Sequence, residues 1–285
     1  MYLQPDSTLE ACEILASRRC QIVSGATDLY ARPRESGAEL AMLDISKIWA
    51  LRGIAIGSDH IRIGATTRWS EIRDADLPPA LHALQMAARE IGSIQIQSRG
   101  TLGGNLCNAS PAADGIPPLL VANAEVELVS NKGVRQLGLP EFLLADGGTA
   151  IQQEELLHSI IIPHASADTV SAYAKLGLRR DMVISVLVVA VVLRRAEDGR
   201  VRDVRIAVGA ASKAALRLRK LEDRLIGTVL PAHSVVVEED VSDLTPIDDV
   251  RGSADYRRRA AVVLLNRTLN QAANGVRDTG SDACA

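Results

Sequence analysis

The sequence predicts an α+β protein of two domains, and three observations support this. The chain has 285 residues, whereas one domain usually holds about 100–200. It is 47% hydrophobic and 24% charged, the composition of a globular protein with a substantial core. Segments that read as strands are interleaved with segments of helical periodicity. We expect the boundary between the two domains near residue 165.

The first part of the chain is predicted to be rich in strands. Ser7 and Glu10 have the spacing of a capping box, which predicts a helix through about Ser17. Strands are expected next, at residues 20–23, 40–45, 54–57 and 61–64. The last two flank Ser58-Asp59-His60 and therefore predict a hairpin.

The middle of the chain combines a helix, an irregular stretch and a second hairpin. Apolar residues recur at helical spacing from Pro79 to about Glu90. Residues 94–108 contain three glycines and fit neither a helix nor a strand. Alternation over residues 125–129, followed by Asn131-Lys132-Gly133, predicts a strand and a turn.

The second domain is predicted to contain strands and two helices. Residues 183–193 are rich in β-branched side chains, and residues 201–208 alternate, so both segments predict strands. Helical spacing predicts helices at residues 213–225 and 254–273. The polar tail from Asn274 to Ala285 is predicted to fray.

Charge and composition exclude several classes of function. The 32 basic and 35 acidic residues are mixed along the chain, so the net charge of -3 creates no strong field for a nucleic acid. The longest apolar run is shorter than the about 20 residues of a membrane helix. The N-terminus lacks the pattern of a cleaved secretory signal, which predicts a cytoplasmic protein.

Cysteine and histidine positions predict no metal site. The cysteines are Cys12, Cys20, Cys107 and Cys284, and no two of them are close in the sequence. The five histidines lie apart from one another and from any cysteine or carboxylate cluster. This distribution suits a reducing compartment.

Two glycine-containing loops are the candidate functional features, because G-x-G-x-x-G, Walker A, nucleophile-elbow and zinc-protease motifs are absent. The first is Ser24–Asp28 and the second is Arg99–Asn108. Glycine lets the backbone approach a ligand, and successive amides form a concave donor site that suits phosphate oxygens. The loops therefore predict a diphosphate site. The alternative is that Gly25 belongs to a strand-end turn and Gly103-Gly104 to a bulge or hairpin turn.

Three further charged positions have two interpretations each. Asp114 either binds a sugar hydroxyl or caps a helix over residues 116–122, which has two early prolines. Lys175 and the pair Arg179-Arg180 either lie near a ligand or end a solvated strand.

The sequence resembles the FAD-binding medium subunit of the molybdenum hydroxylases, the family of xanthine dehydrogenase and carbon monoxide dehydrogenase. The Ser24–Asp28 loop matches the family's AGGTD-like loop, and residues 43–45 and 61–67 match the strands that follow it. The most specific match is Thr101–Asp114, with the sequence TLGGNLCNASPAAD. The resemblance covers nearly the whole chain. It implies a two-lobed FAD-binding domain of the p-cresol methylhydroxylase type (PCMH/VAO) over residues 1–165, then a smaller α+β domain over residues 166–285.

The resemblance implies FAD as the cofactor. It places the backbone of residues 24–28 and of Thr101 to Asn105 at the FAD pyrophosphate, Asp114 near the adenosine and Lys175 beside the flavin. The full set of expected cofactor contacts is Val23, Ser24, Gly25, Ala26, Thr27, Asp28, Thr101, Gly103, Gly104, Asn105, Cys107, Asn108, Asp114 and Lys175. No side chain is expected to act as a nucleophile or a general acid.

The resemblance also implies partners. A molybdopterin-containing large subunit hydroxylates the substrate, and a small [2Fe-2S] subunit passes electrons to the flavin, which delivers them to NAD+, dioxygen or a quinone. The expected assembly is a dimer of heterotrimers. The substrate stays open, although residues 43–67 look nearest to purine-oxidising relatives. Two alternatives are a self-sufficient flavoenzyme of the same fold, which needs its own acid or base, and a non-redox assembly subunit.

The sequence departs from the family pattern at two positions. Gly25-Ala26 replaces the usual Gly-Gly, and this costs little if residue 26 has a negative φ. Val183 stands where relatives often have Asp, which leaves the roles of residues 179–184 open. The cysteine spacing does not support the inserted cluster of relatives that reduce benzoyl-type thioesters.

Overall fold

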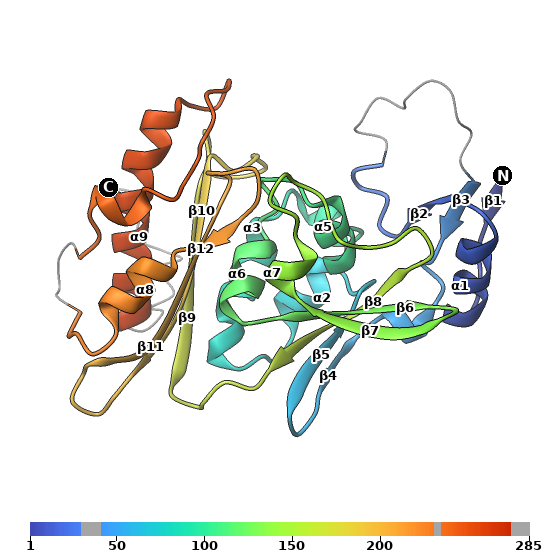
Figure 1. Ribbon diagram of the computed structural model, residues 1–285, viewed down its shortest axis with the longest axis horizontal. Coiled ribbons are helices and arrows are strands. Elements are labelled where there is room, and N and C mark those ends of the chain that lie inside the picture. Colours follow the sequence, from blue (N-terminus) through green and yellow to red (C-terminus); the bar gives the residue numbers. More distant parts are fainter. Residues whose placement is uncertain (30–40, 231–234, 275–285) are drawn as a thin grey trace.

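The computed structural model describes residues 1–29, 41–230 and 235–274 and shows an α+β fold with three sheets. The sheets follow one another along the long axis, with the N-terminus at one end and helix α9 at the other (Figure 1). This arrangement creates two seams, one on each side of the central sheet. The candidate site residues lie along these seams.

The first sheet is a small parallel one with strand order β1-β3-β2. Its elements are β1 (Tyr2–Leu3), α1 (Thr8–Ser17), β2 (Cys20–Val23) and β3 (Ala41–Asp44). Helix α1 begins as predicted, because the Ser7 hydroxyl accepts the amide of Glu10 at 3.2 Å. Leu40, the first residue of the predicted second strand, lies outside the described residues. Leu15 and Leu43 pack with Leu156 of the central sheet, which joins the two parts.

The central sheet is antiparallel, with strand order β4-β5-β8-β6-β7. The strands are β4 (Ile54–Ile56), β5 (His60–Gly64), β6 (Glu125–Ser130), β7 (Gly133–Gly138) and β8 (Leu156–Pro163). Both predicted hairpins are confirmed. The short helices associated with this part of the chain are η1 (Trp49–Leu51), α2 (Trp69–Asp74), η2 (Pro79–Leu81), α3 (His82–Glu90), α4 (Ile94–Gln97), α5 (Leu102–Asn108), α6 (Ile116–Val121) and α7 (Leu139–Phe142).

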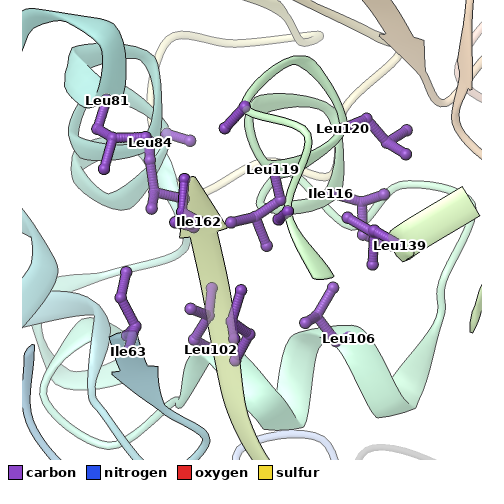
Figure 2. Close-up of a cluster of buried hydrophobic side chains, with 14 of the residues drawn as sticks. Ile63, Leu81, Leu84, Leu102, Leu106, Ile116, Leu119, Leu120, Leu139 and Ile162 are labelled. Atoms are coloured by element: carbon purple, nitrogen blue, oxygen red, sulfur yellow. The ribbon is translucent and has the colours of Figure 1, made fainter. Parts of the chain in front are cut away.

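The core of this part is apolar and continuous. Figure 2 shows Leu102 and Leu106 pointing from α5 toward Leu119 of α6 and Ile162 of β8. All four side chains are at most 2% exposed. Burial of this kind contributes roughly 1.5–3 kcal/mol for each large aliphatic side chain. Helix α5 is therefore held in place by its apolar face, which leaves its other face available to a ligand.

The third sheet is antiparallel with strand order β12-β11-β10-β9 and has both faces covered. Its strands are β9 (Thr169–Leu176), β10 (Leu187–Arg195), β11 (Val201–Gly209) and β12 (Leu216–Arg217), and its helices are α8 (Arg219–Leu225), η3 (Glu238–Val241) and α9 (Ala254–Asn274). Val189 and Val191 pack in one core with residues of α8 and α9, whereas Val188 and Ala190 pack in the core of the central part. In Figure 1, α8 and α9 lie on one side of this sheet and α3 and α6 on the other. Successive residues of β10 therefore pack into two different apolar cores, and this explains why nearly all residues of the strand are apolar.

Three sequence predictions differ from the structure. The predicted strand 183–193 begins only at Leu187, where pairing with β9 starts. Residues 94–108 are not irregular: they form α4 and α5, because Thr101 caps α5 and its leucines at positions 102 and 106 share one face. The predicted helix 213–225 begins only at Arg219, since Leu216–Arg217 pair with β11 as a strand. The tail beyond Asn274 lies outside the described residues.

A charged network fixes the start of α9 to the third sheet. Arg257 is 2% exposed and donates to the carbonyl of Ala210 at 2.7 Å and to Asp249 at 2.6 Å. Arg251 also donates to Asp249. Hydrogen bonds from Arg251, then that from Arg257, lower the pKa of Asp249 to about 2. The carboxylate is therefore needed in its charged form.

We expect Asp249→Asn to lower the free energy of unfolding by about 1 kcal/mol at neutral pH, a value reduced for solvent screening near the surface. Because the folded pKa lies below the unfolded one, this stabilisation is present above about pH 4 and disappears as the pH falls toward about 2. Urea unfolding at pH 7 and pH 3 measures it. Asp255→Asn, in the exposed pair with Arg259, is the control. A difference between wild type and Asp249→Asn that is equal at both pH values would contradict the prediction.

Candidate functional site

The two glycine loops predicted from the sequence lie against each other. A Cβ atom added to Gly25 would lie 2.1 Å from the carbonyl oxygen of Arg99 and 2.9 Å from Cα of Gly100. A Cβ atom on Gly100 would in turn lie 3.5 Å from Oγ1 of Thr27. Only a residue without a side chain permits this approach at position 25. Gly25 is therefore needed to bring the loops together.

The first loop offers unused hydrogen-bond donors. Within the described part of the chain, the amides of Gly25, Ala26 and Thr27 donate to no other group. The Ser24 hydroxyl is buried and has no partner there either. Ala26 is left-handed, with φ 58°, and a turn follows it. A left-handed residue followed by a turn is one of the backbone arrangements found in anion-binding nests.

The φ of Ala26 is positive, so the condition under which alanine costs little at this position is not met. A non-glycine residue in the left-handed region costs roughly 1–2 kcal/mol, because its Cβ approaches the following carbonyl. Ala26 thus holds a conformation that glycine adopts more readily.

We expect Ala26→Gly to raise the free energy of unfolding, because it removes this strain. The gain is about 0.5–1 kcal/mol, since the greater flexibility of glycine in the unfolded chain offsets part of it. Thermal or urea unfolding measures the change. Ala109, which is left-handed at the end of α5, is a matched second position. A loss of stability on Ala26→Gly would show that the loop has another conformation.

The second loop contains the whole of α5, and Gly103-Gly104 lie in the first turn of this helix. The bulge or hairpin interpretation of these glycines is therefore wrong. Thr101 is the N-cap and accepts the amide of Gly104 at 3.1 Å. The amides of Leu102 and Gly103 donate to the carbonyls of Thr67 and Ala65. These three amides are thus already engaged within the chain. A ligand can still approach the backbone closely at the exposed Gly104.

Gly103 and Asn105 have different surroundings. A Cβ atom on Gly103 would lie 2.6 Å from the carbonyl oxygen of Ala65, so this glycine serves packing. The Oδ1 atom of Asn105 is buried without a partner in the described chain. It lies beside Gly115, where an added Cβ would be 2.8 Å from it. An amide oxygen with no donor is costly unless a ligand or water supplies one.

The last turn of α5 contains Cys107 and Asn108. Cys107 is exposed and is not in a disulfide. The surrounding protein nevertheless raises the pKa of its thiol to about 12 by desolvation. The thiol is therefore neutral at physiological pH and is no nucleophile.

Asp114 and Lys175 form a buried ion pair between the central and third sheets. Lys175 Nζ lies 2.7 Å from Asp114 Oδ2 and 3.0 Å from the carbonyl of Glu90. The two side chains are 4% and 8% exposed. Ser185 donates to the other carboxylate oxygen at 2.5 Å. The cap of α6 is Gly115, without a side-chain hydrogen bond, so the capping interpretation of Asp114 is wrong.

Burial dominates the electrostatics of this cluster. Desolvation raises the pKa of Asp114, while Lys175 and Ser185 act in the opposite direction. Burial also raises the pKa of Tyr173 well above its ordinary value, and its hydroxyl has no partner among the described residues. Arg179 and Arg180 are exposed, and Arg179 donates to the carbonyls of Asp181 and Met182. The two arginines thus lie in the exposed connection between β9 and β10.

The structure adds residues that the sequence analysis did not include in the site. The ring of Trp69 lies between Gly100 and Gly115. A Cβ atom on Gly115 would lie 2.4 Å from this ring, and one on Gly100 would lie 3.3 Å from it. Ser185 orients the Asp114 carboxylate. The available signal for Ser185 was its position as the one polar residue in the apolar run 183–193. For Trp69 the sequence held no comparable signal.

Other kinds of site are not seen in the part of the chain that the structure describes. It contains no group of three or more His, Cys, Asp or Glu side chains placed to hold a metal ion. None of its helices is both long and apolar enough to cross a membrane. The donors and glycines described above are therefore the best-formed candidate site.

Comparison with known proteins agrees with this geometry. Residues 1–165 match the family described as the FAD binding domain in molybdopterin dehydrogenase, and residues 171–272 match the CO dehydrogenase flavoprotein C-terminal domain. The chain is 27% identical to the xanthine dehydrogenase FAD-binding subunit of Escherichia coli O157:H7, over 95% of each chain. It is 30% identical to the carbon monoxide dehydrogenase medium chain of Hydrogenophaga pseudoflava, over 95% of this chain and 96% of that one.

A solved structure is similar over the same length. Carbon monoxide dehydrogenase from Hydrogenophaga pseudoflava contains a chain that superposes with a TM-score of 0.88 and 28% identity, covering 95% of this chain and 96% of that one. The predicted combination of an FAD-binding domain with a smaller α+β domain is thereby confirmed as the fold class.

Proposed function

Because this chain belongs to the family of FAD-binding domains in molybdopterin dehydrogenases, we propose that it carries electrons from an iron–sulfur partner to an external acceptor. Membership makes it an FAD-binding oxidoreductase subunit of the molybdenum hydroxylase type. The electron donor is a small [2Fe-2S] subunit and the acceptor is NAD+, dioxygen or a quinone. A large molybdopterin subunit hydroxylates the substrate, and two such heterotrimers form a dimer.

The observation that carries the proposal is the contact between the two glycine loops. The first loop, where it meets the second, offers three amides and the Ser24 hydroxyl, none of which has a partner in the described chain. Asn105 Oδ1 is an acceptor, so it suits a donor group of the cofactor and not its phosphates. Amides and hydroxyls in a concave site suit a diphosphate, which is doubly charged and accepts hydrogen bonds at every oxygen. The residues present thus fit the linker of FAD. Of the predicted contacts, residues 24–28 are the better donors, while α5 provides close approach at Gly104.

The remaining residues position the cofactor and exclude water. Asp114 fixes Lys175 at the seam between the central and third sheets, so that its positive charge lies at a defined place. When bound, FAD supplies the redox chemistry, and the protein supplies orientation and electrostatics. The ion-paired Asp114 and Lys175 are not free to act as acid or base, which supports an electron-transfer role. We further propose that the two domains meet near residue 165, in the connection between β8 and β9.

The substrate of the complex is a property of the partner subunit in this proposal. The relatives named for xanthine and for carbon monoxide are 27% and 30% identical to this chain. Such similar values give no preference for a purine over carbon monoxide. The reaction can be identified in two ways. One is to determine the polypeptides and metals that purify with the chain, and the other is to find the substrate that bleaches its flavin.

The test of FAD binding is a pair of matched variants. Ser24→Ala removes a buried hydroxyl that has no partner in the described chain, so we expect no loss of stability without FAD. It should weaken FAD binding several-fold, because a hydrogen bond contributes about 0.5–1.5 kcal/mol. Thr8→Ala is the control, because the Thr8 hydroxyl is equally buried and unpaired but lies in α1. FAD titration followed by flavin fluorescence measures both.

Two results would overturn the proposal. Purified, folded chain that shows no flavin absorbance after incubation with FAD and removal of the unbound FAD contradicts FAD binding. Turnover of an organic substrate by the isolated, FAD-loaded chain contradicts the electron-transfer role and supports a self-sufficient flavoenzyme. Equal FAD affinity in Ser24→Ala and Thr8→Ala would show that the diphosphate does not bind at the first loop.

A further inference from the structure

We propose that the indole N–H of Trp69 is a further hydrogen-bond donor of the cofactor site and binds an oxygen atom of FAD. The inference rests on the proposed function, since it adds a contact to the same site. Trp69 belongs to neither glycine loop and is not one of the contacts that the family resemblance implies. Its assignment depends on the structure alone.

The backbone joins Trp69 to the second loop. Trp69 is the first residue of α2, and its amide donates to the carbonyl of Gly100 at 3.1 Å. The preceding residue, Arg68, pairs with Thr101 as an isolated antiparallel bridge. Thr101 is the N-cap of α5. The start of α2 is therefore fixed against the start of α5, and the Trp69 ring has a defined place beside the second loop.

The edge of the ring that carries Nε1 lies between two glycines. Near one end of this edge is Cδ1, and a Cβ atom added to Gly100 would lie 3.3 Å from it. Toward the other end is Cζ2, which would lie 3.1 Å from a Cβ atom added to Gly115. In an indole ring, Nε1 is bonded to Cδ1 and is one carbon away from Cζ2. The N–H therefore lies on this edge, and neither glycine has a side chain to cover it.

The N–H is both unpaired and accessible. Trp69 as a whole is only 2% exposed. Its Nε1 makes no hydrogen bond within the described chain, and it is not among the fully buried polar atoms there that lack a partner. The small exposed part of Trp69 therefore includes the N–H. The N–H of a nearly buried tryptophan usually finds an acceptor, and a ligand oxygen can supply one here.

The neighbours of the N–H belong to the proposed FAD site. On one side, the Cβ atom added to Gly100 would lie 3.5 Å from Oγ1 of Thr27, in the loop that offers unpaired amides. On the other side, the Cβ atom added to Gly115 would lie 2.8 Å from Oδ1 of Asn105. An indole N–H can only donate, so its partner is an acceptor oxygen. FAD has two such sources, its phosphates and the hydroxyl groups of its sugar chains.

The experiment compares the two tryptophans of the chain, Trp49 and Trp69. Trp69→Phe keeps an aromatic ring but removes the N–H. We expect it to bind FAD about tenfold more weakly in a titration followed by flavin fluorescence. Trp49→Phe is the control, because Trp49 is 77% exposed and its ring lies beside Arg52. This variant should bind FAD like the wild type.

A second replacement separates the hydrogen bond from packing, since phenylalanine is smaller than tryptophan. In the Trp49→Phe background, biosynthetic incorporation of benzothienylalanine places a sulfur atom where Trp69 has its N–H and nearly keeps the shape of the ring. It should weaken FAD binding by the same factor and leave urea unfolding of the FAD-free chain unchanged. A purely structural role of the ring would not produce this combination.

The indole nitrogen–proton NMR resonance of Trp69 identifies the oxygen. Inorganic pyrophosphate should shift it if the acceptor is a phosphate oxygen, and riboflavin, which has hydroxyls but no phosphate, if the acceptor is a hydroxyl. FAD affinity equal to wild type in both Trp69 replacements overturns the inference, as does an indole proton that exchanges equally fast with and without FAD. Both results require FAD to bind. They are therefore distinct from a failure of the proposed function, in which the wild type itself binds no FAD.

Discussion

Gly25→Ala is expected to abolish FAD retention and to destabilise the protein by about 3 kcal/mol or more. The added methyl carbon would lie 2.1 Å from the carbonyl oxygen of Arg99 and 2.8 Å from its carbonyl carbon. Both neighbours are backbone atoms and cannot turn away as a side chain can. The two loops must therefore separate, which removes the concave donor site.

The matched control is Gly57→Ala, in the β4–β5 hairpin. There the nearest atom to an added Cβ is the carbonyl oxygen of His60, at 3.2 Å, so only a small adjustment is needed. We expect this variant to keep its FAD and nearly all of its stability. Urea unfolding of the FAD-free chain and the ratio of FAD to protein after gel filtration are the two measurements. Gly25→Ala with FAD content equal to that of Gly57→Ala would show that FAD binds elsewhere.

Much of the fold could be predicted from local patterns. The hairpin at residues 54–64 has short apolar segments around the polar turn Ser58-Asp59-His60, and residues 125–128 alternate before the turn Asn131-Lys132-Gly133. Such signals lie within a few residues of one another. Helix α5 could not be predicted in this way. Its first turn holds Gly103 and Gly104, which lower helix propensity, and its stability comes from Leu102 and Leu106 in the core. Tertiary packing therefore outweighs local propensity there.

The candidate site was only partly predictable for the same reason. The two loops could be identified because glycine clusters are local features of the sequence. The resemblance to the family then indicated which residues of the two loops contact the same cofactor. The left-handed Ala26 could not be predicted, since alanine rarely adopts this conformation and only the loop contact imposes it. The contact of Asp114 with Lys175 joins residues 61 positions apart. No spacing rule in the sequence reports a contact across two sheets.

Removing one member of the Asp114–Lys175 pair should lower the stability of the protein strongly. Asp114→Asn keeps the size of the side chain but leaves the Lys175 ammonium, in a side chain 4% exposed, without a carboxylate. Breaking a buried pair in this way costs about 3–5 kcal/mol, because the remaining charge cannot regain its hydration. The loss should also loosen the seam between the two domains, since Ser185 donates to the same carboxylate.

The double variant Asp114→Asn with Lys175→Met separates the pairwise interaction from the packing of each side chain. We expect it to be more stable than Asp114→Asn alone, because no uncompensated charge remains buried. Urea unfolding of the FAD-free proteins gives the coupling free energy without a contribution from the cofactor. Lys132→Met, in the exposed pair with Glu154, should change stability little and serves as the control. If the single and double variants were equally destabilised, the pair would contribute only through packing, and the position that we propose for Lys175 beside the cofactor would need another cause.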